Sequence, residues 1–160
     1  MMRHWQYLKY VLRHKLFVFQ AGLALNVPIL MLLFHDWDKF LPDEWLPYAR
    51  CFYAPDGTKQ YKESSDFTNA WNLHQKRNKH HWQFWLITWD RGETEALAMP
   101  DVFRREMLAD WRGAGKAING VENTLEWYTK QADKMILHPE TREWIEKKLN
   151  YKGQTHNEEI

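Results

Sequence analysis

The chain has 160 residues, enough for one domain with a substantial apolar core. Its net charge of +1 excludes the uniformly basic surface that binds nucleic acid nonspecifically. The single cysteine, Cys51, excludes an intramolecular disulfide framework and a cysteine-rich zinc site, and it fits a reducing, cytoplasmic setting. Ten tryptophans supply large buried surfaces, whereas eight histidines suit metal binding and proton transfer.

Two helices are predicted at the start of the chain. Apolar residues at three- and four-residue steps predict the first helix over 3–25. The second is predicted from Pro28, a favoured first-turn residue, to about Phe40. The uncharged stretch 16–34 is just long enough to cross a bilayer, but Pro28 and two amide side chains interrupt it. We therefore predict two buried helices that meet at 26–28, and no membrane span.

The rest of the chain is also predicted to be helical, with loops between the helices. Asp66 is predicted to cap one of these helices, residues 113–120 to be a frayed continuation of another, and 87–100 to be irregular or a short hairpin. No repeat and no clear series of strands is visible. We predict an all-α, single-domain bundle of six to seven helices over 1–152, followed by a flexible polar tail at 153–160. The later helices are expected over 41–53, 67–85, 101–111, a stretch that begins at 123, and 140–149.

Candidate metal ligands are spread over several of these helices. If the chain reverses at 26–28, His14 and His35 return to the same end of the helical hairpin. Two of the histidines in the fourth helix are seven residues apart and would share one helix face. Either that helix ends early or only one of His80 and His81 is a ligand, and the sequence leaves this choice open. In chain order, the candidates are His14, His35, Asp36, His74, His80, His81 and Asp110.

The mixture of imidazole and carboxylate suits one or two divalent transition metal ions, namely Fe, Mn, Zn, Ni or Co. One carboxylate can bridge two ions, and an ion pair can activate water and stabilise the leaving oxygen of a phosphate ester. Asp36, beside His35, is the predicted bridge and a predicted catalytic residue. Lys39, about one helical turn later, is the second predicted catalytic residue and would hold a phosphate oxygen. Arg77 is predicted to add a bidentate contact to that phosphate.

Each candidate also has an ordinary structural explanation. A single His14 on an apolar helix is more often a satisfied or surface histidine. The pair at 35–36 could form a hydrogen bond at a helix end, and the basic run around His74 could be a solvated face. Asp110 could pair with Arg112. Taken singly, the structural explanation is preferred each time, and only the ordered combination of all seven residues favours a metal site.

That order resembles the HD-domain superfamily of metal-dependent phosphohydrolases. The "HDWDK" stretch resembles the His-Asp-X-X-Lys variant of the branch that cleaves cyclic dinucleotides. The Gly-Tyr-Pro element of that branch is missing after His81, so its substrate is not implied. Lys39 also replaces the catalytic glutamate of some nucleotidase relatives. The resemblance implies a helical bundle with one ion held by His14, His35, Asp36 and Asp110, and a second held by Asp36, His74 and either His80 or His81.

Over about residues 10–150, the chain is also similar to a small family of phages and bacteria whose function is unknown. The segments that carry this similarity are "HDWDKF", "PYARCFY", "AWNLHQKRNKHHWQFW" and "MPDVFRREMLADWRGAGKA". The similarity implies no substrate. A phage-encoded member would act in the cytoplasm of its host.

Three functions are compatible with these observations. The first is a phosphohydrolase that acts on a nucleotide or another small phosphate ester through a metal-activated water, as a monomer or a homo-oligomer. Trp37, Trp82 or Trp111 could stack on a base, although core packing is the default for a single tryptophan. The second is a di-iron oxygenase on the same scaffold. The third is a non-enzymatic interaction or membrane-associated protein with structural histidines.

Overall fold

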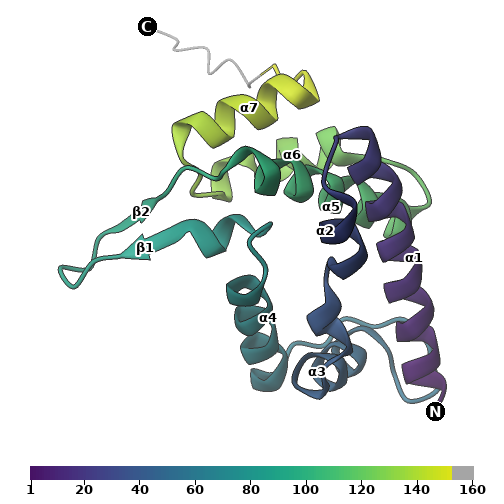
Figure 1. Cartoon of the computed structure of the whole chain (residues 1–160). Helices are drawn as coiled ribbons and strands as arrows, with labels where there is room; N and C mark the ends of the chain where they lie inside the picture. The colour runs from purple at the N-terminus through teal and green to yellow at the C-terminus, as the bar shows by residue number, and fades with distance from the viewer. Residues whose placement is uncertain (153–160) are drawn as a thin grey trace, which may run out of the picture.

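The computed structural model describes residues 1–152, and the predicted tail at 153–160 lies outside the described residues. Within 1–152 the chain forms seven α-helices, three short 3-10 helices and one small hairpin. Figure 1 shows how the helices and the hairpin are arranged. The all-α, single-domain bundle predicted from the sequence is confirmed. The α-helices are α1 (Met2–Ala24), α2 (Ile29–Phe34), α3 (Pro42–Phe52), α4 (Ser65–Arg77), α5 (Asp101–Asn119), α6 (Thr124–Gln131) and α7 (Pro139–Leu149).

The two longest helices, α1 and α5, pack against each other more extensively than any other pair of elements in the described residues. They approach closely at Gly113, where a Cβ atom would lie 2.4 Å from Cγ2 of Val18. Only a residue without a side chain fits at this distance. The prediction that 113–120 is frayed was therefore wrong, because close packing on α1 keeps α5 helical as far as Asn119.

The second predicted helix ends earlier than expected. α2 stops at Phe34, and the 3-10 helix η1 (Trp37–Phe40) follows after a break. Asp36 in that break has φ +52°, a left-handed conformation that a continuous α-helix does not allow. The prediction that this helix is buried was also wrong, since four of its six apolar side chains are more than half exposed and only Leu32 is buried. No helix in the described residues is both long enough and apolar enough to cross a membrane.

The fourth predicted helix is also shorter than expected at its C-terminal end. α4 is capped by Ser64, whose Oγ accepts a hydrogen bond from the backbone N–H of Phe67, and the predicted cap Asp66 lies within the helix. The helix ends at Arg77 because the side-chain amide of Asn78 bonds back to the carbonyl oxygen of His74, at 3.0 Å. His80 and His81 therefore both lie beyond α4, so the seven-residue spacing of His74 and His81 does not place them on one helix face. Of the two alternatives that the sequence left open, the early end of this helix is the one observed.

The segment after α4 contains η2 (Trp82–Trp85) and then a hairpin of β1 (Leu86–Thr88) and β2 (Thr94–Ala96), in antiparallel register. This agrees with the hairpin alternative for 87–100. The third 3-10 helix, η3 (Ala132–Lys134), joins α6 to the segment before α7.

The core consists of two apolar clusters, one that includes residues of α1 and one that includes residues of α5. The first joins α1, α3 and α4, and the second joins α5, α6 and α7. A buried polar cluster bridges α1, α4 and α5, and this cluster contains the candidate ligands. The main side chains of the first apolar cluster are Tyr7, Val11, Tyr48, Phe67 and Ala70, and those of the second are Met107, Leu108, Tyr128, Ile145 and Leu149.

Candidate metal centre

The structure brings all seven sequence-predicted ligands together in two groups that share Asp36. In each group every residue offers one nitrogen or oxygen atom, and these atoms lie within 4.8 Å of one another. Five of the seven side chains are buried, and His81 and Asp110 are partly exposed. The first group is His14, His35, Asp36 and Asp110, and the second group is Asp36, His74, His80 and His81.

Asp36 lies between the two groups, with one carboxylate oxygen toward each. Its Oδ2 atom is 3.1 Å from Nε2 of His14 and 3.4 Å from Nε2 of His35. Its Oδ1 atom is 3.5 Å from Nε2 of His74 and 3.3 Å from Nε2 of His80. The left-handed backbone of Asp36 places this side chain between α1 and α4 instead of on the surface of a helix. The carboxylate therefore has the position of a bridge between two groups that could each hold a cation.

The first group is held by the packing of the long helices. His14 is on the buried face of α1, and Asp110 is on α5, with Oδ1 3.1 Å from Nε2 of His14. His35 comes from the break after α2, and its Nε2 atom is 3.3 Å from the same Asp110 oxygen. Lys15 on α1 donates a hydrogen bond to the carbonyl oxygen of His35, which fixes the break against α1.

The second group consists of the end of α4 and the turn that follows it. His74 occupies the last turn of α4, and His80 and His81 lie between Asn78 and η2. The Nε2 atoms of all three histidines are buried and have no hydrogen-bond partner in the described residues, and neither does Oδ1 of Asp36. A buried polar atom without a hydrogen-bond partner lowers the stability of a folded protein by about 1–3 kcal/mol. The convergence of four such atoms fits a cation that accepts their lone pairs, and both His80 and His81 belong to the group.

Three further carboxylates, which were not assigned from the sequence, lie outside the two ligand groups and orient their histidines. Oε1 of Glu106 is 3.1 Å from Nδ1 of His35 and 3.7 Å from Nδ1 of His80. Asp38 and Glu44 lie 2.9 and 3.0 Å from Nδ1 of His74. A carboxylate on Nδ1 fixes the proton there and turns the Nε2 lone pair toward the centre, as in many metal sites. Only Glu106 had a sequence signal, its position one turn before Asp110 on α5.

The electrostatics of the cluster follow from burial and from these contacts. Burial alone would raise the pKa of Asp36, but His35, Lys39 and His74 hold it well below its usual value. Burial lowers the pKa of His74, yet Asp36, Asp38 and Glu44 outweigh burial and raise that pKa to about 9. Burial and the neighbouring His80 and His74 hold the pKa of His81 well below the ordinary value. His81 is therefore neutral and able to donate a lone pair.

The two cationic side chains assigned from the sequence have different positions. Nζ of Lys39 is buried and lies 2.6 Å from Oδ2 of Asp36, inside the cluster. Arg77 is instead paired with two carboxylates, at 2.7 Å from Asp43 and 2.8 Å from Glu44. Glu44 lies between its guanidinium and His74, and the assignment of Arg77 as a phosphate ligand stays a prediction. Arg77 supports the carboxylate that orients His74.

A cavity of about 350 Å³ opens directly onto the cluster at His81 and Asp110. It lies between the turn after α4 and the α5–α6 connection. Of the tryptophans proposed from the sequence as base-stacking residues, Trp82 and Trp111 line this cavity, whereas Trp37 is an exposed side chain elsewhere. Lys134 is the one basic residue among the lining residues in the described part of the chain. The tryptophans that line the cavity are Trp71, Trp82, Trp111 and Trp127.

Comparison with known proteins identifies one family. A search of curated proteins and a search of solved structures each gave no match. A model of a family of unknown function, DUF5662, matches residues 3–151, which covers the helical domain and all seven candidate ligands. The chain therefore belongs to the DUF5662 family of unknown function.

Proposed function

We propose that this protein is a metal-dependent phosphohydrolase of the HD type, acting on a nucleotide or another small phosphate ester. One observation carries the proposal: the carboxylate of Asp36 directs one oxygen to each of two groups of buried imidazoles. The grouping supports the HD assignment because the first group is the ligand set that the resemblance implied, and the second contains the implied set with both His80 and His81. Divalent ions held by such groups lower the pKa of bound water and neutralise charge on a phosphate.

Lys39 supplies the positive charge that a phosphate ester requires beside the ligands. Its ammonium group is already held beside Oδ2 of Asp36, so the side chain does not have to move when the substrate binds. Asp36 holds it by an ion pair that spans only three residues. In the proposed reaction Lys39 stabilises the negative charge that develops on the phosphate oxygens.

The cavity beside His81 supports a substrate with a planar ring. Its aromatic walls include Trp111 and Trp127, whose ring centroids are 5.0 Å apart, and tryptophan faces stack well on bases. Four amide side chains line the same space and can hydrogen-bond to the edge of a ring. Because Lys134 is the one basic lining residue in the part of the chain described, the cavity favours a single phosphate over a polyphosphate. The amides are Gln83, Asn119, Asn123 and Gln131.

Metal analysis followed by a substrate screen tests this function. Protein purified without a histidine tag should contain transition metal at one to two equivalents. Phosphorylated metabolites should be screened with manganese, iron, cobalt and nickel, with phosphate release as the readout. We expect release from nucleoside monophosphates, and loss of that release on chelation. Folded protein that takes up no metal, or metal-loaded protein that releases phosphate from no compound, would refute the proposal.

A di-iron oxygenase is the second candidate, since the same shared carboxylate and nitrogen-rich ligand set also suits two irons. Anaerobic iron loading followed by exposure to O₂ separates the two functions. A mixed-valence signal together with O₂ uptake would favour the oxygenase. Iron-loaded protein that consumes no O₂ but hydrolyses a phosphate ester would exclude it. A fully folded protein without affinity for metal would instead support the non-enzymatic alternative.

A further inference from the structure

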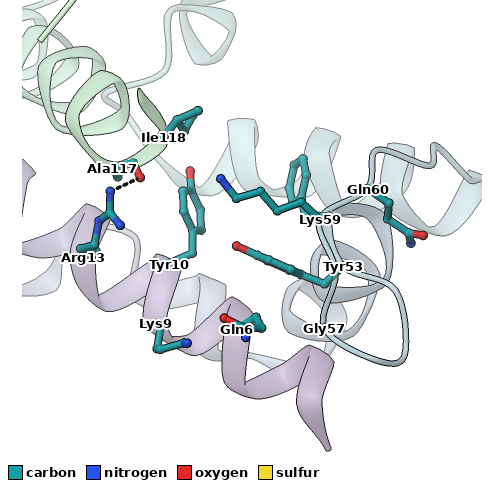
Figure 2. Close-up of a pocket in the computed structure, with 11 residues that line it drawn as sticks. Gln6, Lys9, Tyr10, Arg13, Tyr53, Gly57, Lys59, Gln60, Ala117 and Ile118 are labelled. Atoms are coloured by element: carbon teal, nitrogen blue, oxygen red, sulfur yellow. Dashed lines mark hydrogen bonds between the residues drawn. The ribbon is translucent and has the colours of Figure 1, made fainter. Parts of the chain in front are cut away.

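A second and larger cavity, of about 530 Å³, lies away from the tryptophan-lined one, between α1, the loop after α3 and the end of α5 (Figure 2). None of the seven candidate metal ligands lines it, and Ile118 is the one residue that it shares with the first cavity. Its volume falls within the range of about 300–1,000 Å³ that is typical of small-molecule sites. The role of this cavity is not explained by the proposed hydrolysis.

The charge of this second cavity is wholly positive. Lys9, Arg13 and Lys59 line it, and no aspartate or glutamate does. None of the three forms an ion pair with a carboxylate in residues 1–152, although most of the other arginines of the fold do. Arg13 donates hydrogen bonds to backbone carbonyl oxygens at the end of α5, at 2.7 Å from Ala117, and this contact holds its guanidinium at the cavity wall. Three unneutralised cations around one cavity favour an anionic ligand.

The remaining lining groups indicate what else the ligand carries. The hydroxyl groups of Tyr10 and Tyr53 point into the cavity, and the side chain of Lys59 extends across it toward Tyr10 (Figure 2). Neither hydroxyl has a hydrogen-bond partner within 1–152. The rings of these tyrosines, with Phe52 and Ile118, provide an apolar and largely aromatic wall. Such a wall suits a planar ring, and the free hydroxyls suit the polar atoms of a sugar or a phosphate.

We propose that this cavity is a separate binding site for a phosphorylated compound with a planar ring, of the mononucleotide class. Arg13 and Lys59 contact the phosphate, and Tyr10 and Tyr53 contact the ring and its polar substituents. The ring of Tyr10 packs on that of His14, with centroids 6.1 Å apart. The occupant is therefore next to the wall of the metal centre but contacts no metal ligand.

Titration calorimetry with adenosine 5′-(α,β-methylene)diphosphate, whose bridging carbon resists hydrolysis, tests this site. We expect saturable binding that is at least tenfold weaker in the charge reversal Lys59→Glu and at least fivefold weaker in Lys59→Gln. The Lys59 side chain makes no hydrogen bond or ion pair in the described structure, so these variants should fold normally. Arg13→Gln should add to the effect, with thermal melting as a check on its contact to α5. Adenosine, which lacks phosphate, should bind more weakly than the probe.

Two further variants separate this site from the metal centre. The matched control Lys62→Gln/Lys147→Gln removes two exposed charges elsewhere and should change affinity less than twofold. Asp36→Asn disables the metal centre and should leave the binding event that depends on Lys59 unchanged, so the result does not depend on whether the protein is a hydrolase. The proposal is overturned if the probe does not saturate, if Lys59→Glu binds like the wild type, or if Asp36→Asn alone abolishes the binding event that depends on Lys59.

Discussion

The two ligand groups share one carboxylate but are built in different ways. The first combines two carboxylates with two imidazoles, and it draws His14 and Asp110 from the middle of the two longest helices. The second combines three imidazoles with Asp36 alone, and two of those imidazoles lie beyond the end of α4. The first group therefore has more negative charge and a more rigid frame. We therefore expect the first group to bind a hard divalent ion more tightly, and the second to select a softer ion and bind it more weakly.

Both ligand groups depend on the carboxylate of Asp36, so its substitution has the largest expected effect. Asp36→Asn keeps the size of the side chain and tolerates the left-handed backbone, but it removes the charge that serves both groups. We expect loss of both metal equivalents and of at least about 10³-fold in turnover, because a di-metal site without its bridge cannot activate water. Elemental analysis, phosphate release and far-ultraviolet circular dichroism measure these effects.

The helical signal of Asp36→Asn should be largely retained. The control Asp90→Asn changes an exposed aspartate in the hairpin loop and should leave metal content and turnover unaltered. Full metal content in Asp36→Asn would show that the carboxylate bridges nothing.

Removing one ligand from each group tests the difference between them directly. Asp110→Asn should eliminate the tighter of two binding events, and His81→Gln should eliminate the weaker one. Each variant should therefore retain about one equivalent of metal, with competition against a chelator as the measurement. Equal losses of affinity in the two variants would contradict the difference that we infer.

Lys39 belongs to the side of Asp36 that faces the first group, since it contacts Oδ2. Lys39→Gln should lower kcat by about 10²–10³, the usual loss when one charged or hydrogen-bonding stabiliser of a transition state is removed. Metal content should be retained, because Lys39 is not a ligand. Steady-state kinetics and metal analysis of the same sample measure the two effects. A parallel fall in metal content and kcat would show that Lys39 has a structural role.

The smallest expected effects come from the carboxylates outside the ligand groups. Glu106 contacts histidines of both groups, whereas Glu44 contacts only His74. Glu106→Gln should weaken both binding events, and Glu44→Gln only the second, each by about 10–100-fold. Metal titration of the two variants side by side measures this. If Glu44→Gln weakened the tighter event, the assignment of His74 to the second group would be wrong.

Much of the fold was predictable because its signals are local. Apolar periodicity and the prolines at the starts of α3, α5 and α7 located most of the helices to within a few residues. Where α2 and α4 end was not predictable in this way. Asp36 interrupts its helix because tertiary contacts hold it in a left-handed conformation, and Asn78 terminates α4 partly through a hydrogen bond to Asp38, forty residues earlier in the chain. Neither contact has a local pattern.

In the candidate site, the candidate metal ligands were predictable from the sequence, but the residues that surround them were not. The order of the histidines and aspartates indicated all seven residues that the structure brings together. The orienting carboxylates Asp38 and Glu44 were missed, since an acidic residue after Asp36 or in the first turn of α3 has an ordinary local explanation. Arg77 was assigned a phosphate contact because a basic residue beside His74 suggests one, and its pairing with Asp43 and Glu44 depends on how α3 packs against α4.

The missing side chain at Gly113 has a consequence for chemistry that takes place elsewhere. Gly113 is one turn after Asp110 on α5, and Val18 is one turn after His14 on α1. The close contact between Gly113 and Val18 therefore sets the distance between the two helices near His14 and Asp110. A methyl group added there would wedge the two helices apart and increase that distance. The spacing of the ligands in the first group is thus set in part by a residue that has no side chain with which to bind an ion.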